Sequence, residues 1–374
     1  MQDKKLIVGL ITLTLGMSGV LSWYLFASSP APHSLSLNRA EIGSAADQES
    51  EPEISVKPGR VAVPAPISSG EAISAETDGK GRVLFYDPES GVVTAIDYRS
   101  GREEIISPTR LIGFIKTIWA PSKEEVISQF SSSQGATFRY FNYLTKRVVS
   151  LGHAILSPVF SPDSSRIAYF TKTATEAGIY IATPDNSESK RILGTRFSKA
   201  ALAWPGDDLI SIIVTDDQGQ NSLFTVTPEG KLTKLAEAVD HLEVRWSKGG
   251  VKALISLFDT TGKLYAVVLD PRTLEQHVLD VETRASQCVW GNDNRRAICA
   301  VSQTPISLAT VENQSKTPQN FYEIDTVSGE KKLLSPSGVR GPRVYVSEIL
   351  LSPAEDYLFF VNDYDQKLYS FKLP

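Results

Sequence analysis

Five arginines lie in polar segments that connect predicted β-strands: Arg110, Arg196, Arg284, Arg340 and Arg343. A guanidinium group presents several N–H donors in one plane and recognises carboxylates and phosphates. On a chain with a formal net charge of −5, several such groups on one face would favour an anionic ligand. Alternatively, each arginine pairs with a neighbouring carboxylate or faces water, and their unequal distances from the following strands weaken the idea of a ring. We treat the five as candidate binding residues.

The two cysteines, Cys288 and Cys299, are placed evenly about the predicted turn Asn292–Arg295. Strands joined by that turn would pair antiparallel, and this spacing would bring the two side chains opposite each other at disulfide distance. A location outside the cytoplasm would favour the bond. The alternative is two small buried side chains on different faces of the hairpin. The sequence leaves both interpretations open, and it contains no cysteine framework and no cysteine zinc site.

Motifs of several enzyme classes are missing from the sequence. It contains no Gly-x-Ser-x-Gly elbow, no phosphate loop and no GxGxxG. Asp363–Asp365 and Asp216–Gly219 are similar to fragments of calcium loops, but neither continues with the required Glu, so we interpret both as polar turns. Asp97 and Asp325 end predicted strands and are interpreted as turn caps. The histidines are scattered, with no pair at the spacing of metal ligands: His33, His153, His241 and His277. We expect no metal and no cofactor.

The elements that must position these residues form a repeat along the C-terminal three quarters of the chain. An apolar strand ends at a large residue and is followed by a polar turn and a second apolar strand, most clearly in Pro158–Phe170 and Ile349–Phe360. The large residues are Trp119, Phe160, Trp204, Trp246, Trp290 and Leu351, at separations of 41, 44, 42, 44 and 61 residues. A repeat of roughly 40–45 residues built from four short strands is typical of a β-propeller.

Seven segments alternate with the period of two that the third strand of a blade requires: 93–98, 138–142, 178–183, 222–227, 263–270, 321–325 and 367–371. We therefore predict an all-β, seven-bladed propeller; six or eight blades would require one misplaced strand. Ala72–Ala75 would be the inner strand of the first blade. The chain ends after the third strand of the last blade, so we expect Arg60–Pro64 to supply its outer strand and to close the ring.

The N-terminal segment predicts the location of the protein. Leu6–Phe26 has no charged residue and is long enough to cross a bilayer as a helix. Lys4 and Lys5 precede it, and no Lys or Arg lies between it and Arg39, which places the N-terminus in the cytoplasm and the propeller outside. A cleaved signal peptide is the alternative, although its apolar core is normally shorter. We predict a single-pass protein of the cytoplasmic membrane.

The predicted organisation has four parts: a cytoplasmic tail (1–5), a transmembrane anchor (6–26), a linker (27–58) and the propeller domain (59–374). The linker is rich in Ser, Pro, Ala and Glu and carries few large apolar side chains. Such a segment buries too little apolar surface to offset its chain entropy, so we expect it to be disordered.

Ser161–Phe170, which reads SPDSSRIAYF, resembles the TolB-like propeller repeat, a WD-like repeat, together with Gly178–Ala182 and Lys190–Leu193 that follow it. The resemblance covers roughly residues 70–374 and is good in one blade. Similar repeats occur in the propellers of prolyl-oligopeptidase-type enzymes. TolB-like proteins are periplasmic, partner-binding propellers preceded by a small α/β domain, so the resemblance implies the fold and a binding role. Here an anchor and a linker replace that α/β domain, and partners and contact residues do not carry over.

The sequence-based hypothesis is a non-enzymatic propeller that binds a protein or an anionic envelope polymer. The negative net charge argues against a nucleic-acid partner. One alternative is a propeller lyase or hydrolase with its active site in the central funnel, and another is a structural subunit of a cell-envelope complex. An enzyme would need converging His, Lys, Tyr or carboxylate side chains, and His153 is the only histidine expected near a funnel loop. We expect long loops on the funnel face at Ser131–Ala136, Lys172–Ala177 and Gln303–Asn320.

Overall fold

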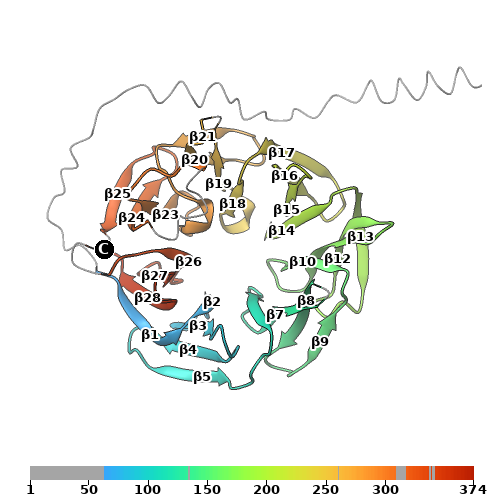
Figure 1. Ribbon diagram of the computed structural model, residues 1–374, viewed down its shortest axis with the longest axis horizontal. Helices are drawn as coiled ribbons and strands as arrows, with labels where there is room; N and C mark the ends of the chain where they lie inside the picture. Colours follow the sequence, from blue (N-terminus) through green and yellow to red (C-terminus); the bar gives the residue numbers. More distant parts are fainter. Residues whose placement is uncertain (1–62, 134, 260, 309–316, 337, 339–341) are drawn as a thin grey trace, which may run out of the picture. The chain divides into compact units, whose positions relative to one another are not determined.

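The computed structural model describes residues 63–133, 135–259, 261–308, 317–336, 338 and 342–374. These residues form seven four-stranded sheets, in which neighbouring strands pair antiparallel. The sheets are arranged as blades around a common axis (Figure 1). The predicted all-β, seven-bladed propeller is confirmed. The expected anchor, linker and Arg340 lie outside the described residues, within which no helix is long and apolar enough to cross a membrane.

Each blade contributes one strand to each of four concentric positions. The inner strands are β2 (Ile73–Thr77), β6 (Phe114–Trp119), β10 (Ile155–Phe160), β14 (Lys199–Gly206), β18 (Glu243–Trp246), β22 (Cys288–Trp290) and β26 (Val346–Leu351). The second strands are β3 (Arg82–Tyr86), β7 (Glu125–Ser132), β11 (Ile167–Lys172), β15 (Leu209–Thr215), β19 (Ala253–Phe258), β23 (Arg296–Ser302) and β27 (Tyr357–Asn362).

The third strands are β4 (Val93–Asp97), β8 (Gly135–Asn142), β12 (Ala177–Ala182), β16 (Asn221–Val226), β20 (Leu264–Leu269), β24 (Gln319–Asp325) and β28 (Lys367–Lys372). The outer strands are β5 (Glu103–Ser107), β9 (Val148–Leu151), β13 (Ser189–Thr195), β17 (Leu232–Val239), β21 (Gln276–Leu279), β25 (Lys331–Ser335) and β1 (Ala65–Glu71). Two single turns of 3-10 helix, η1 (Lys248–Gly250) and η2 (Ala285–Gln287), adjoin inner strands.

The ring closes through β1, which pairs with β28 so that the last blade contains both ends of the propeller domain. The expected closing segment Arg60–Pro64 was placed too early, because the strand is Ala65–Glu71 and leads directly into β2. Its sequence APISSGE contains Pro, Gly and two Ser, which hide the strand pattern. An outer edge strand tolerates proline because its free side needs no donor. The hydroxyl of Ser68 also accepts the backbone N–H of Leu368 at 3.0 Å.

The core consists of apolar side chains packed between neighbouring blades. Phe321 of the sixth blade contacts the rings of Phe360 and Phe371 in the seventh at centroid distances of 4.9 and 5.1 Å. Every residue of β19 is buried, because a second strand has neighbours on both edges and a blade on either face. Burial of apolar surface makes the main favourable contribution to the free energy of stacking the blades.

Polar side chains connect the inner strands of neighbouring blades through hydrogen bonds. They occupy one repeated position, three residues before the last residue of the inner strand. The hydroxyls of Ser74 and Ser157 accept N–H groups of the next blade at 2.9 and 2.8 Å. The carboxylates of Glu243 and Glu348 do the same at 3.1 and 2.8 Å. Gln287 instead donates to a carbonyl of the next blade, at 3.3 Å. These contacts hold the strands around the axis, and therefore the loops above them, in register.

Candidate functional site

One face of the ring carries the connections from each outer strand to the next inner strand, and we call it the entry face. The connections between second and third strands lie on the same face, because successive strands of a blade run antiparallel. Six inter-blade connections belong to it: residues 108–113, 152–154, 196–198, 240–242, 280–287 and 336–345. At the seventh junction, only Ala72 separates β1 from β2.

Each of the six connections carries an arginine or a histidine in its described part. In chain order these are Arg110, His153, Arg196, His241, Arg284 and Arg343. All are exposed except Arg284, which is half-buried. Loops held by a rigid scaffold are common positions for binding residues. The structure therefore brings four of the five candidate arginines to one face and adds two imidazoles, while Arg340 lies outside the described residues.

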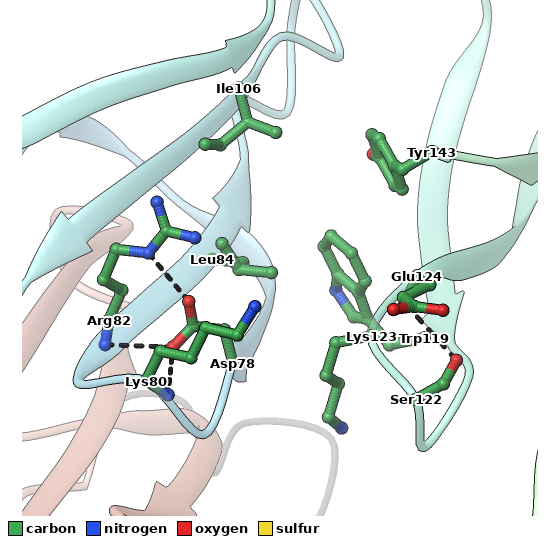
Figure 2. Close-up of a pocket in the computed structure, with 10 residues that line it drawn as sticks. All are labelled: Asp78, Lys80, Arg82, Leu84, Ile106, Trp119, Ser122, Lys123, Glu124 and Tyr143. Atoms are coloured by element: carbon green, nitrogen blue, oxygen red, sulfur yellow. Dashed lines mark hydrogen bonds and ion pairs between the residues drawn. The ribbon is translucent and has the colours of Figure 1, made fainter. Parts of the chain in front are cut away.

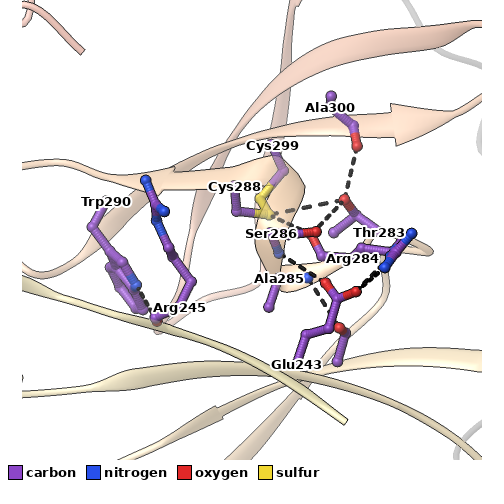
Figure 3. The surroundings of a disulfide bond; sticks show 11 residues. Glu243, Arg245, Thr283, Arg284, Ala285, Ser286, Cys288, Trp290, Cys299 and Ala300 are labelled. Atoms are coloured by element: carbon purple, nitrogen blue, oxygen red, sulfur yellow. Dashed lines mark hydrogen bonds and ion pairs between the residues drawn. A yellow bond between two sulfur atoms is a disulfide. The ribbon is translucent and has the colours of Figure 1, made fainter. Parts of the chain in front are cut away.

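Arg284 differs from the other arginines because a carboxylate already binds it. Its guanidinium donates to Glu243 from Nε at 2.7 Å and from Nη2, and the second oxygen of Glu243 accepts the N–H of Ser286 (Figure 3). Arg284 thus fastens the fifth blade to the sixth. Among the described residues, no carboxylate lies within ion-pair distance of Arg110, Arg196 or Arg343.

His241 is a residue of this face that sequence reasoning missed, since only His153 was expected there. β18 has just four residues, so the connection that precedes it extends to Leu242. The imidazole of His241 meets the ring of Phe258 edge-on at a centroid distance of 5.9 Å. The signal in the sequence that could have placed His241 on this face was its position five residues before Trp246.

The long loops of the entry face are fewer than expected. Ser131–Ala136 is not a loop, because β7 continues to Ser132 and β8 begins at Gly135. Residues 173–176 form a short turn in which Thr173 bonds to Glu176. The connection 303–318 is long, and its described part is attached to the rest of the face by the N–H of Ile306, which donates to Glu282 at 3.0 Å.

Cys288 and Cys299 lie opposite each other in the pairing of β22 with β23 and form a disulfide, with an S–S distance of 2.11 Å. Both residues are fully buried. Thr283 lies beside the bond and donates from its hydroxyl to the carbonyl of Ala300 at 2.7 Å (Figure 3). The disulfide therefore braces the strand that follows the Arg284 connection.

Cavities lie between neighbouring blades on the opposite face. The cavity between the first two blades has a volume of about 210 Å³ and is lined by Arg82, Trp119 and Tyr143 among others (Figure 2). Arg82 is bound there by Asp78 at 2.7 Å. Burial raises the pKa of Tyr143, whose hydroxyl bonds to that of Tyr86 at 2.7 Å. The arginine of this cavity already has a carboxylate partner. Arg110, Arg196 and Arg343 have none among the described residues, so the entry face is the better candidate for binding an anion.

Solved structures share this fold, although no family model and no curated protein matches the sequence. An oligogalacturonate lyase in complex with manganese matches over 84% of this chain and 90% of that chain, with 12% identity and a TM-score of 0.57. The β-propeller domain of the trilobed protease from Pyrococcus furiosus matches over 83% and 96%, with 11% identity and a TM-score of 0.56. TolB from Acinetobacter baumannii matches over 72% and 66%, with 12% identity and a TM-score of 0.47. The matches with the lyase and the protease domain show that the chain shares the β-propeller fold.

The comparisons correct the sequence-based hypothesis of a non-enzymatic binding module. That hypothesis is contradicted, because the matching structures include an enzyme, the lyase, whose chain is matched over 90% of its length. At 12% identity the likeness concerns the fold alone, and the fold occurs in enzymes and in other proteins. In the described part of the chain, no group of three or more His, Cys, Asp and Glu side chains could hold a metal ion, so we assign no step to manganese.

Proposed function

We propose that the protein is an enzyme that binds an acidic oligosaccharide on the entry face and cleaves it there, as a lyase or a hydrolase. One observation carries this proposal: an arginine or histidine occurs in each of the six inter-blade connections of that face. Three of these arginines have no carboxylate partner among the described residues. The match with the oligogalacturonate lyase, an enzyme of an acidic sugar by its name, supports the choice of substrate class.

The side chains of the entry face suit the chemistry of a uronate lyase. An arginine bound to the uronate carboxylate stabilises the negative charge that develops when the neighbouring carbon loses its proton. An imidazole is a common general base for that proton. The electrons of the C–H bond then form a carbon–carbon double bond, and the glycosidic oxygen leaves and takes up a proton. In ring order His153 lies between Arg110 and Arg196, and His241 lies between Arg196 and Arg284.

The test is incubation of the purified protein with oligogalacturonate and, in parallel, with a neutral oligosaccharide of similar length. A lyase gives an unsaturated product that absorbs ultraviolet light, and a hydrolase gives new reducing ends without that absorbance. We expect cleavage of the acidic substrate only. Arg196→Gln should lower kcat roughly 100–1000-fold, as removal of a group that stabilises developing charge commonly does.

Arg147→Gln is the matched control, because Arg147 lies in a turn of the opposite face and pairs with Asp185 at 2.7 Å. We expect it to keep full activity. Absence of both products across a panel of acidic oligosaccharides would overturn the proposed enzymatic function. Equal cleavage of the neutral substrate would overturn the role assigned to the arginines.

A further inference from the structure

Arg245 is a cation on an inner strand that the entry face does not use. It lies on β18, one residue before Trp246, and its carbonyl accepts the indole N–H of Trp290 at 2.8 Å. Its guanidinium extends past the sixth blade and donates from Nη2 to the carbonyl of Ile349 in the seventh, at 3.3 Å. Figure 3 shows that the guanidinium lies apart from the Glu243–Arg284 pair. Burial among the inner strands lowers the pKa of Arg245.

Two carboxylates on other inner strands, Glu76 on β2 and Glu348 on β26, are already bound by other groups. The charge of Glu76 acts on Arg245, but Glu76 pairs with Lys123 at 3.2 Å and accepts the N–H of Thr77 at 3.0 Å. Glu348 uses its two oxygens for the N–H groups of the first blade, at 2.8 Å each. In the described part of the chain, Arg245 forms no ion pair with either carboxylate.

This arrangement leaves most of the hydrogen-bonding capacity of Arg245 without a protein partner. A guanidinium has five N–H donors, and within the described part of the chain the guanidinium of Arg245 makes one hydrogen bond, a long contact to a neutral carbonyl. The side chain of Arg245 is half-buried, and a cation that is partly withdrawn from water and lacks a counter-charge is costly. The planar fork of donors matches two oxygens of a carboxylate, sulfate or phosphate group. An oxyanion therefore supplies both the missing charge and the missing acceptors.

We propose that Arg245 is the centre of an oxyanion-binding site inside the ring, among the inner strands of the fifth, sixth and seventh blades. Its ligand is a small oxyanion of the sulfate, phosphate or carboxylate type. A bound oxyanion would hold Arg245 in place and thereby couple β18 to β26, so it stabilises the folded ring. The site is separate from the loops of the entry face, and its test needs no substrate and no turnover.

The test measures binding of sulfate, phosphate and acetate to the full chain by isothermal titration calorimetry, at constant ionic strength in chloride. We expect one oxyanion per chain. Thermal unfolding under the same conditions should show a Tm that rises with oxyanion concentration, by roughly 3–6 °C at a hundredfold excess over Kd. A comparison of the three anions identifies which geometry the site prefers.

Arg245→Met removes the charge and the N–H donors but keeps an unbranched side chain, and we expect it to abolish both the titration signal and the rise in Tm. Arg147→Met, on the opposite face, is the matched control and should keep both, because Arg147 already pairs with Asp185. Because only the oxyanion-dependent part of the Tm is compared, a change in basal stability of Arg245→Met does not obscure the result. If that variant does not fold, Arg245→Lys provides the measurement, since a point charge without the fork should weaken binding several-fold.

Two outcomes would overturn the site. One is the absence of binding of all three oxyanions to the wild-type protein at tens of millimolar. The other is an unchanged Kd in a folded Arg245 variant, which would move the binding to another cation. Loss of oxyanion binding in Arg110→Met with its retention in Arg245→Met would assign the effect to the entry face, which belongs to the proposed function.

Discussion

The carboxylate of Glu348 accepts the backbone N–H of Ser74 at 2.8 Å and so joins the inner strand of the last blade to that of the first. Its second oxygen accepts the N–H of Ala75 at the same distance. This contact closes the ring near the axis, as the pairing of β1 with β28 closes it at the rim. Burial raises the pKa of Glu348, although the two N–H groups oppose that rise.

Glu348→Gln should destabilise the propeller by about 1–3 kcal/mol, because an amide nitrogen cannot accept and one buried N–H loses its partner. Since the folded pKa is raised, the stability linked to Glu348 is fully present below 4.5 and is lost as the pH rises through the folded pKa. The difference between the wild type and the variant should therefore be largest in acid and shrink as the pH rises above that value. Urea unfolding at several pH values measures it; a difference that grows with pH would contradict this role.

The aspartates in the turns opposite the entry face should make the protein sensitive to acid. Hydrogen bonds from the hydroxyls of Ser161 and Ser165 lower the pKa of Asp163 to about 2. Its contribution to stability is present above 3.8 and is lost as the pH falls towards 2. Asp163→Asn should flatten the decline of Tm in that interval. Asp217→Asn, on an exposed turn of the entry face, is the control and should leave the decline unchanged.

Removal of the closing strand should open the ring. A chain that begins at residue 72 lacks β1 and exposes the edge of β28, whereas a chain that begins at residue 63 keeps the pairing. We expect the shorter chain to melt at a lower temperature and to associate through its free edge. Circular dichroism melting and light scattering compare the two. Equal melting temperatures would show that β1 contributes nothing to ring stability.

Loss of the disulfide should destabilise the sixth blade. The bond joins residues separated by 11 positions, for which the chain-entropy model gives roughly 2–3 kcal/mol. The double variant Cys288→Ala/Cys299→Ala should unfold at lower urea concentration than the oxidised wild type. A reducing agent should lower the stability of the wild type and leave the variant unaffected. Thiol labelling that finds two free thiols in the folded protein purified without a reducing agent would refute the bond.

Charge reversal on the entry face should weaken binding of an acidic oligosaccharide. Arg343 and Arg196 have no carboxylate partner among the described residues. Arg343→Glu and Arg196→Glu should therefore each lower the affinity for the oligosaccharide several-fold. Added salt should also lower the affinity of the wild-type protein. Arg147→Glu, on the opposite face, should bind normally. Arg340 lies outside the described residues, and the sequence predicts that Arg340→Glu adds to the effect of Arg343→Glu. If both variants keep the Tm and the oligosaccharide affinity of the wild type, these arginines do not bind the substrate.

The sequence by itself determined the architecture. The large residues that end apolar strands, from Trp119 to Leu351, recur at about the length of one propeller blade. A repeat that cannot bury its faces alone must stack against its neighbours. Period-two patterns identified all seven third strands, from Val93–Asp97 to Lys367–Lys372. These features are local, so they can be read without knowledge of the fold. The membrane anchor at Leu6–Phe26 rests on the same kind of local signal and stays a prediction.

Only the tertiary structure decided which residues act together. The closing strand Ala65–Glu71 was misplaced because its strand character comes from β28, some 300 residues away in the chain. Arg284 was grouped with the free arginines because its partner, Glu243, belongs to another blade. His241 lies on the entry face because β18 has only four residues. Arg245 has no ion pair with Glu76 or Glu348, because Glu76 pairs with Lys123 and Glu348 accepts N–H groups of the first blade. Partners of this kind are set by packing around the axis, which brings together residues that sequence spacing does not relate.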